Sequence, residues 1–149
     1  MAELASLKTR AYICACEAHK GQIDKANAAY ILHPLHVARQ FQDEDGYVVG
    51  MLHDVLEDSS LTAEDLEADP WMIPRRLVES VKVLTHKDDG LSYMQYIERV
   101  KKDPLARRVK IVDLEHNMDM SRYSCEPTEQ MMSRLRRYEK ALDFLLTED

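Results

Sequence analysis

Apolar positions recur every three or four residues along most of the chain, and the strict alternation typical of half-buried strands is scarce. The clearest case is residues 75–84, where Leu77, Val81 and Leu84 fall on one face of a helix. Only four glycines are available to interrupt such helices. The pattern therefore predicts an all-α fold.

The predicted elements form a bundle of seven or eight helices joined by short connections. Gly21 suits the end of the first helix, Pro34 suits the first turn of the second, and Thr62 with Asp65 resembles a capping box. We expect residues 85–90 to form a polar loop open to solvent. The expected helices cover about residues 3–20, 33–38, 47–56, 62–68, 75–84, 92–101, 104–120 and 127–146.

Length and charge limit the possible functions. A chain of 149 residues with 45% hydrophobic residues is expected to form one domain over residues 1–149, with its own core. A net charge of -7 disfavours binding to DNA, which relies on clustered Lys and Arg. It allows an anionic small molecule if a metal supplies the local positive field. No apolar run reaches about 18 residues, so no membrane span is expected.

Three cysteines, Cys14, Cys16 and Cys125, occur without a Cys-x-x-Cys pair. This arrangement argues against a disulfide scaffold and against a zinc ribbon. Residues 1–5 lack the basic and apolar stretches of a secretory signal. We therefore expect a cytoplasmic protein, and leave its oligomeric state open.

A dense group of ionisable residues, His53, Asp54, Glu57 and Asp58, follows the apolar stretch 48–52. Buried charges are costly without a partner, and a divalent metal could serve several of them at once. In a continuous helix, His53 lies one turn from Glu57, and Asp54 one turn from Asp58. The spacing thus predicts an imidazole and three carboxylates along one wall.

Polar residues interrupt apolar stretches at two further places, and these residues could complete the group. Asp113 lies one turn from Lys110 and from Asn117 on the predicted helix 104–120. This face is either solvated, or it turns Asp113 toward His53, with Lys110 and Asn117 at the mouth of a cavity. His33, just before Pro34, is either a hydrogen-bonded core histidine or another member of the group.

Together, His33, His53, Asp54 and Asp113 would make a set of two imidazoles and two carboxylates. Mixed nitrogen and oxygen ligation suits Mn²⁺, Fe²⁺ or Zn²⁺ rather than Ca²⁺. Such a metal lowers the pKa of a bound water and holds phosphate oxygens. Glu57 and Asp58, which are not needed as ligands, would then be free for general acid and base catalysis.

At these residues the chain resembles the HD-domain metal phosphohydrolases, and in particular the RelA/SpoT-type hydrolase domain with its small stand-alone forms. The likeness spans about residues 11–123 and rests on four segments: residues 18–22 with Lys25, 30–38, 52–59, and 110–113 with 116–118. A His-Asp pair alone is a weak signal. The second and third segments together make it specific.

The resemblance implies an HD bundle whose metal, usually Mn²⁺, is held by the four residues named above. It implies that Glu57 and Asp58 are the catalytic acidic pair, and that Lys25 and Asn117 contact the nucleotide. The family reaction is hydrolysis of the 3′-pyrophosphate of (p)ppGpp. Lys110 is a further candidate for substrate binding, and Arg122 is a weaker one.

Three residues depart from the family pattern: Asp24 replaces a basic residue, Leu114 an arginine and Met120 a threonine. We interpret these as changes in substrate recognition that leave the metal chemistry intact. They leave open which nucleotide is the substrate. Two other functions also stay open: a 5′-nucleotidase or other phosphomonoesterase of the HD class, and a module that senses a nucleotide without turnover.

Overall fold

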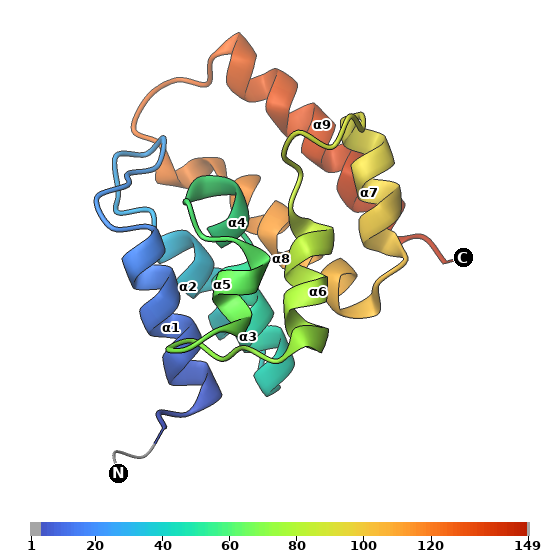
Figure 1. Cartoon of the computed structure of the whole chain (residues 1–149). Coiled ribbons are helices and arrows are strands. Elements are labelled where there is room, and N and C mark those ends of the chain that lie inside the picture. Colours follow the sequence, from blue (N-terminus) through green and yellow to red (C-terminus); the bar gives the residue numbers. More distant parts are fainter. Residues whose placement is uncertain (1–3, 149) are drawn as a thin grey trace.

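The computed structural model describes residues 4–148, which are helical apart from turns, loops and one isolated antiparallel bridge between Ile23 and Ala29 (Figure 1). The prediction of an all-α bundle is confirmed. The predicted start of the first helix at Glu3 lies outside the described residues. The elements are α1 Leu7–Ala18, α2 Leu32–Arg39, α3 Glu44–Leu52, α4 Val55–Asp58, α5 Ala63–Glu67, α6 Arg75–Leu84, α7 Tyr93–Lys101, α8 Pro104–Asn117, the 3₁₀ turn η1 Met120–Arg122, and α9 Glu129–Leu146.

Helix α3 is the centre of the bundle, because it packs against α1, α2, α6 and α8. Its apolar side chains Val48, Val49 and Met51 are fully buried. The crossing of α2 and α3 is tight at Gly50, where an added Cβ would lie 2.9 Å from the Cα of Ala38. This close approach brings together the helix that carries His33 and the end of the helix that precedes His53.

The predicted continuous helix over residues 47–56 is wrong. Helix α3 ends at Leu52, α4 begins at Val55, and His53 with Asp54 forms the turn between them. Asp54 adopts φ -105° and ψ -2°, and the Nδ1 of His53 bonds the carbonyl of Gly50 at 2.6 Å. The described residues consequently hold nine α-helices, one more than the upper prediction. Because of this turn, the side chains of the adjacent residues His53 and Asp54 point toward the same place in the bundle.

Local capping explains most helix starts. The predicted capping box is present, because Thr62 accepts from the amide of Asp65 and the Asp65 side chain accepts from the amide of Thr62. Helix α8 starts behind the Asp103 cap, with Pro104 as its first residue. It ends at Asn117 rather than near residue 120, because η1 follows.

Helix α9 packs against α7 and α8 and buries Ala141 and Leu145, and it crosses the upper part of the view in Figure 1. Its other face brings Arg134, Leu135 and Tyr138 to the lining of a cavity. Within residues 4–148, no helix is both long and apolar enough to cross a membrane.

Candidate metal centre and its cleft

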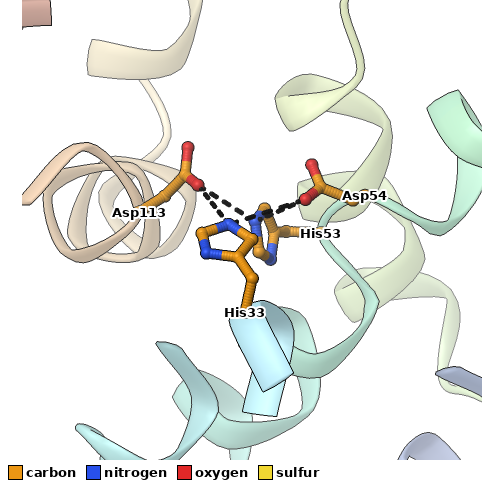
Figure 2. A group of neighbouring side chains, drawn as sticks. All are labelled: His33, His53, Asp54 and Asp113. Atoms are coloured by element: carbon orange, nitrogen blue, oxygen red, sulfur yellow. Dashed lines mark hydrogen bonds and ion pairs between the residues drawn. The ribbon is translucent and has the colours of Figure 1, made fainter. Parts of the chain in front are cut away.

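Four ionisable side chains from α2, α8 and the His53–Asp54 turn converge at the centre of the bundle (Figure 2). One ligand atom from each of His33, His53, Asp54 and Asp113 lies within 4.8 Å of all the others. The Oδ1 of Asp113 lies 2.8 Å from His33 Nε2 and 3.3 Å from His53 Nε2. The Oδ2 of Asp54 lies 3.1 Å from His53 Nε2. Asp113 is only 3% exposed, so the interpretation of its face as merely solvated is wrong.

This donor set fits a first-row divalent cation in its chemistry and in its spacing. Ligands about 2.1 Å from one ion lie about 3 Å apart when adjacent, close to the distances measured here. The ring of His53 is oriented for this role, because its Nδ1–H can donate to the Gly50 carbonyl and leave Nε2 bare.

The electrostatic field at the centre also favours a cation. Burial lowers the pKa of His53, but Asp54 and Asp113 outweigh burial and hold that pKa well above its ordinary value. A field that draws a proton onto a buried imidazole attracts a metal ion in the same way.

His116, to which the sequence interpretation assigned no role, lies directly behind His33. The two Nδ1 atoms are 2.7 Å apart, so one donates and the other accepts. Burial and the neighbouring His33 lower the pKa of His116 to about 4, so the ring is neutral and can accept. In the tautomer that leaves His33 Nε2 free, His33 Nδ1–H donates to His116.

We predict that His116→Phe weakens metal binding by about 10–100-fold, because it removes the acceptor that fixes the tautomer of His33. Calorimetric titration of the apoprotein with Mn²⁺ measures the effect. The matched control is His36→Phe, since exposed His36 stacks on His116 at 3.9 Å without bonding His33. Equal affinities for the two variants would contradict this role.

Two neighbours fix the charge of Asp113. Lys110 Nζ donates to its Oδ2 at 2.8 Å, and Asn117 Nδ2 donates to its Oδ1 at 3.1 Å. Burial opposes ionisation, but Lys110 and the histidines hold the pKa of Asp113 well below its usual range. Burial lowers the pKa of Lys110, but the Asp113 carboxylate outweighs burial and holds that pKa well above its ordinary value. Both groups are therefore charged at neutral pH.

Tyr30 is a second side chain without a role in the sequence interpretation. Its hydroxyl donates to Asp54 Oδ2 at 2.6 Å. Burial and the Asp54 carboxylate raise the pKa of Tyr30, so the hydroxyl keeps its proton. Beneath it, buried His19 packs its ring 5.0 Å from that of Tyr30 and bonds Gln22 through Nδ1. These contacts hold the loop after α1 against the candidate metal centre.

Glu57 and Asp58 lie beside the centre, in a cavity of about 420 Å³ that Asp54 and Asp113 also line. Burial raises the pKa of Glu57 to about 6, although the backbone N–H of His86 donates to its Oε1 at 2.5 Å. Burial and Asp54 raise the pKa of Asp58 as well. A carboxyl group with a pKa of about 6, such as that of Glu57, is suited to exchanging protons near neutral pH.

The prediction that residues 85–90 form a loop open to solvent is correct for Lys87, Asp88 and Gly90, which are exposed, and wrong for His86 and Asp89. His86 and Asp89 are only partly exposed, and His86 lines the same cavity as Glu57. The loop packs inward because its polar groups find partners there, including the Glu57 carboxylate. Nothing in the hydrophobic pattern marks these contacts.

A second cavity of about 370 Å³ adjoins the first, and Lys25, Tyr30, Asn117 and Tyr138 line both. Its walls are more apolar and include Ile23, Met120, Tyr123, Met131 and Leu135. Together the two cavities suit a molecule with an anionic end at the metal centre and a ring system beside it.

The three departures from the family pattern lie in different environments. Asp24 Oδ1 accepts from the amides of Ala26 and Ala28 at 2.9 Å, and its Oδ2 pairs with Arg122 at 3.3 Å. The charge of Asp24 is therefore balanced by Arg122, and its hydrogen bonds to the two amides shape the loop. Met120 lines the second cavity, whereas Leu114 is fully buried in the core. The interpretation of Leu114 as a change in substrate recognition is thus wrong, because its side chain packs in the core.

No protein-family model matches the chain. It is 33% identical over 123 residues to a GTP pyrophosphokinase of Streptomyces coelicolor, covering 76% of this chain and 14% of that protein. It is 31% identical over 136 residues to a guanosine-3′,5′-bis(diphosphate) 3′-pyrophosphohydrolase of Spiroplasma citri, covering 84% and 18%. The chain thus spans less than a fifth of the length of these relatives.

The fold matches a solved structure of a metazoan orthologue of SpoT that hydrolyses ppGpp. The superposition has a TM-score of 0.74 at 22% identity and covers 98% of this chain and 89% of that one. This superposition establishes a shared fold.

Proposed function

The chain belongs to the RelA/SpoT type of HD domains, and from this premise we propose that it is a metal-dependent hydrolase that removes the 3′-pyrophosphate from a (p)ppGpp-like nucleotide. The observation that carries the proposal is the convergence of His33, His53, Asp54 and Asp113 beside the Glu57–Asp58 pair. The Spiroplasma citri relative, named for this reaction, supports the choice of substrate.

The proposed cofactor is Mn²⁺, held by the two imidazoles and two carboxylates of the centre. A divalent cation at this position supplies Lewis acidity, which stabilises charge on phosphate oxygens and makes water easier to deprotonate. The donor set suits Mn²⁺, and it also accepts Fe²⁺ or Zn²⁺. Metal analysis of the purified protein distinguishes them.

The residues around the centre divide the work of hydrolysis. In the proposed reaction, a water oxygen bonds to the phosphorus next to the nucleoside, and the bond from that phosphorus to the 3′-oxygen breaks. Glu57 takes a proton from the attacking water, and Asp58 orients that water. Lys110, which is charged and points at Asp113, offsets negative charge at the phosphate. A positioned general base contributes about 10²–10⁴-fold in rate.

We propose that the nucleoside occupies the second cavity, with Lys25 and Asn117 at the junction. Several cations lie close together in this region. Burial and the nearby charges of Arg134 and Arg137 lower the pKa of Lys25. No carboxylate among residues 4–148 forms an ion pair with these three cations. Unpaired cations in an acidic protein are suited to binding further phosphate groups of the nucleotide.

Arg134→Ala is expected to raise KM for the nucleotide about tenfold with little change in kcat, because it removes a charge-assisted contact away from the reacting bond. Steady-state kinetics of pyrophosphate release provide the measurement. The control is Arg136→Ala, because Arg136 is 60% exposed and lies 3.5 Å from Glu129. An unchanged KM in Arg134→Ala would exclude this contact.

The test of the function is a product assay with Mn²⁺ on (p)ppGpp and on its adenosine analogue. The proposal requires pyrophosphate as product. Orthophosphate would indicate a phosphomonoesterase instead. Thermal stabilisation by the nucleotide without any product would indicate a sensing module. No turnover of either nucleotide by metal-loaded protein would remove the alarmone assignment.

We further propose that the protein acts in the cytoplasm on a small nucleotide rather than on DNA. The three cysteines are free, as expected in a reducing compartment. The net charge of -7 opposes association with a nucleic-acid duplex. Fractionation of cells with detection of the endogenous protein tests the location.

A further inference from the structure

His86 lines the cavity beside the candidate metal centre and forms an imidazole–carboxylate pair with Asp89. The Nδ1 of His86 lies 2.9 Å from Asp89 Oδ2. The other carboxylate oxygen of Asp89 accepts from the amide of Leu91 at 3.0 Å. Arg99 lies 3.5 Å from Asp89 and balances its charge. Asp89 is therefore held in place to orient the ring of His86.

The ring of His86 is also fixed by packing. It stacks on Tyr96 with the ring centroids 4.7 Å apart and an angle of 11°. Tyr96 is 2% exposed and its hydroxyl donates to the Leu84 carbonyl at 2.6 Å. Arg99 donates to the carbonyls of Val83 and Thr85 on the same segment. These contacts hold the loop and the ring of His86 in position.

The remaining nitrogen of His86 has no protein partner. Asp89 occupies Nδ1, and no described residue from 4 to 148 forms a hydrogen bond with Nε2. The side chain lines the cavity that Asp54, Glu57 and Asp58 share. A carboxylate that holds Nδ1 and leaves Nε2 toward the substrate is an arrangement that lets imidazole transfer a proton.

We propose that His86 is the general acid that protonates the leaving 3′-oxygen, and that Asp89 is a positioning residue for it. This inference rests on the proposed pyrophosphohydrolase function. As the bond from phosphorus to the 3′-oxygen breaks, its electron pair stays on oxygen, which takes the proton from His86 Nε2. The proton of the attacking water goes to Glu57. Both side chains then exchange one proton with solvent, so no further reactant is needed.

A main-chain hydrogen bond also links the proposed acid, His86, to the proposed base, Glu57. The amide of His86 donates to Glu57 Oε1, so one residue positions the base through its main chain and supplies the acid from its side chain. The proposed base and acid are thereby held at a fixed separation. The other charged groups near the ring are Arg99 and, across Tyr96, Lys110, whose Nζ lies 5.3 Å from the Tyr96 centroid.

The experiment compares two leaving groups in wild type, His86→Ala and His86→Phe. The nucleotide 3′-pyrophosphate needs a proton on its leaving oxygen, whereas 4-nitrophenyl diphosphate releases a phenolate that does not. We expect both variants to lose about 10²–10³-fold in kcat on the nucleotide and less than about threefold on the nitrophenyl compound. His86→Phe retains the stacking on Tyr96, so it separates proton transfer from packing.

Further measurements complete the test. For wild type we expect kcat/KM to decline at high pH, where a general acid has lost its proton, and we expect this decline to be absent in both His86 variants. Asp89→Asn should lose about tenfold in kcat with the same dependence on leaving group. Lys87→Ala, an exposed neighbour, should match wild type. Equal losses on both leaving groups, or an unchanged pH profile, would overturn the inference. Absence of wild-type turnover would instead refute the proposed function.

Discussion

Asp113→Asn is expected to abolish stoichiometric metal binding and to lower kcat/KM by at least about a thousandfold. Asn has the shape of Asp but not its charge. Asp113 lies within 3.3 Å of both candidate histidine ligands, and its loss leaves Asp54 as the one carboxylate of the four-residue group. Metal analysis after dialysis against Mn²⁺, together with kinetics of pyrophosphate release, measures both effects.

The control for this substitution is Asp119→Asn, which removes a carboxylate just beyond α8. Asp119 is exposed, and among residues 4–148 its side chain accepts hydrogen bonds only from Ser121, so metal content and rate should match wild type. Thermal unfolding checks that Asp113→Asn remains folded, because Lys110 loses its charged partner. A folded Asp113→Asn variant with full metal content and rate would refute the assignment of this ligand.

Glu57→Gln is expected to lower kcat by about 10²–10⁴-fold while metal content stays unchanged. The amide cannot take a proton from water, but it can still accept the hydrogen bond from the His86 amide. The matched control is Glu64→Gln, which alters an exposed carboxylate on α5. Loss of metal together with activity would show instead that Glu57 is a ligand.

The pH dependence gives an independent check on Glu57. A base acts in its deprotonated form, and burial raises the pKa of Glu57 to about 6. In wild type, kcat/KM should therefore fall as pH decreases through about 6 or slightly below, since a bound cation favours the carboxylate. Glu57→Gln should lack this acidic limb. If the limb persists in the variant, another group is the base.

Local sequence patterns were sufficient to predict most helices, because apolar spacing and caps act within one or two turns. The face of α6 and the capping box at Thr62 are examples. The turn at His53 and Asp54 was not predictable in this way. Local spacing favours a continuous helix there, whereas the turn brings both side chains to face residues from α2 and α8.

In the candidate site, too, local patterns reveal some residues and miss those whose partners are distant in the sequence. The four ligand candidates could be found because ionisable residues interrupt apolar stretches. The His86 loop could not be placed, because its partner Glu57 lies 29 positions away and no local pattern links them. The pairing of Asp24 with Arg122 spans 98 positions, so the effect of Asp24 on local charge also required the fold.

The most direct test of the proposed metal centre is a crystal structure of the protein grown with Mn²⁺, with anomalous diffraction recorded at the manganese edge. We predict one strong anomalous peak within bonding distance of His33 Nε2, His53 Nε2 and the carboxylates of Asp54 and Asp113. A peak elsewhere, or no peak at this position in protein saturated with Mn²⁺, would contradict it.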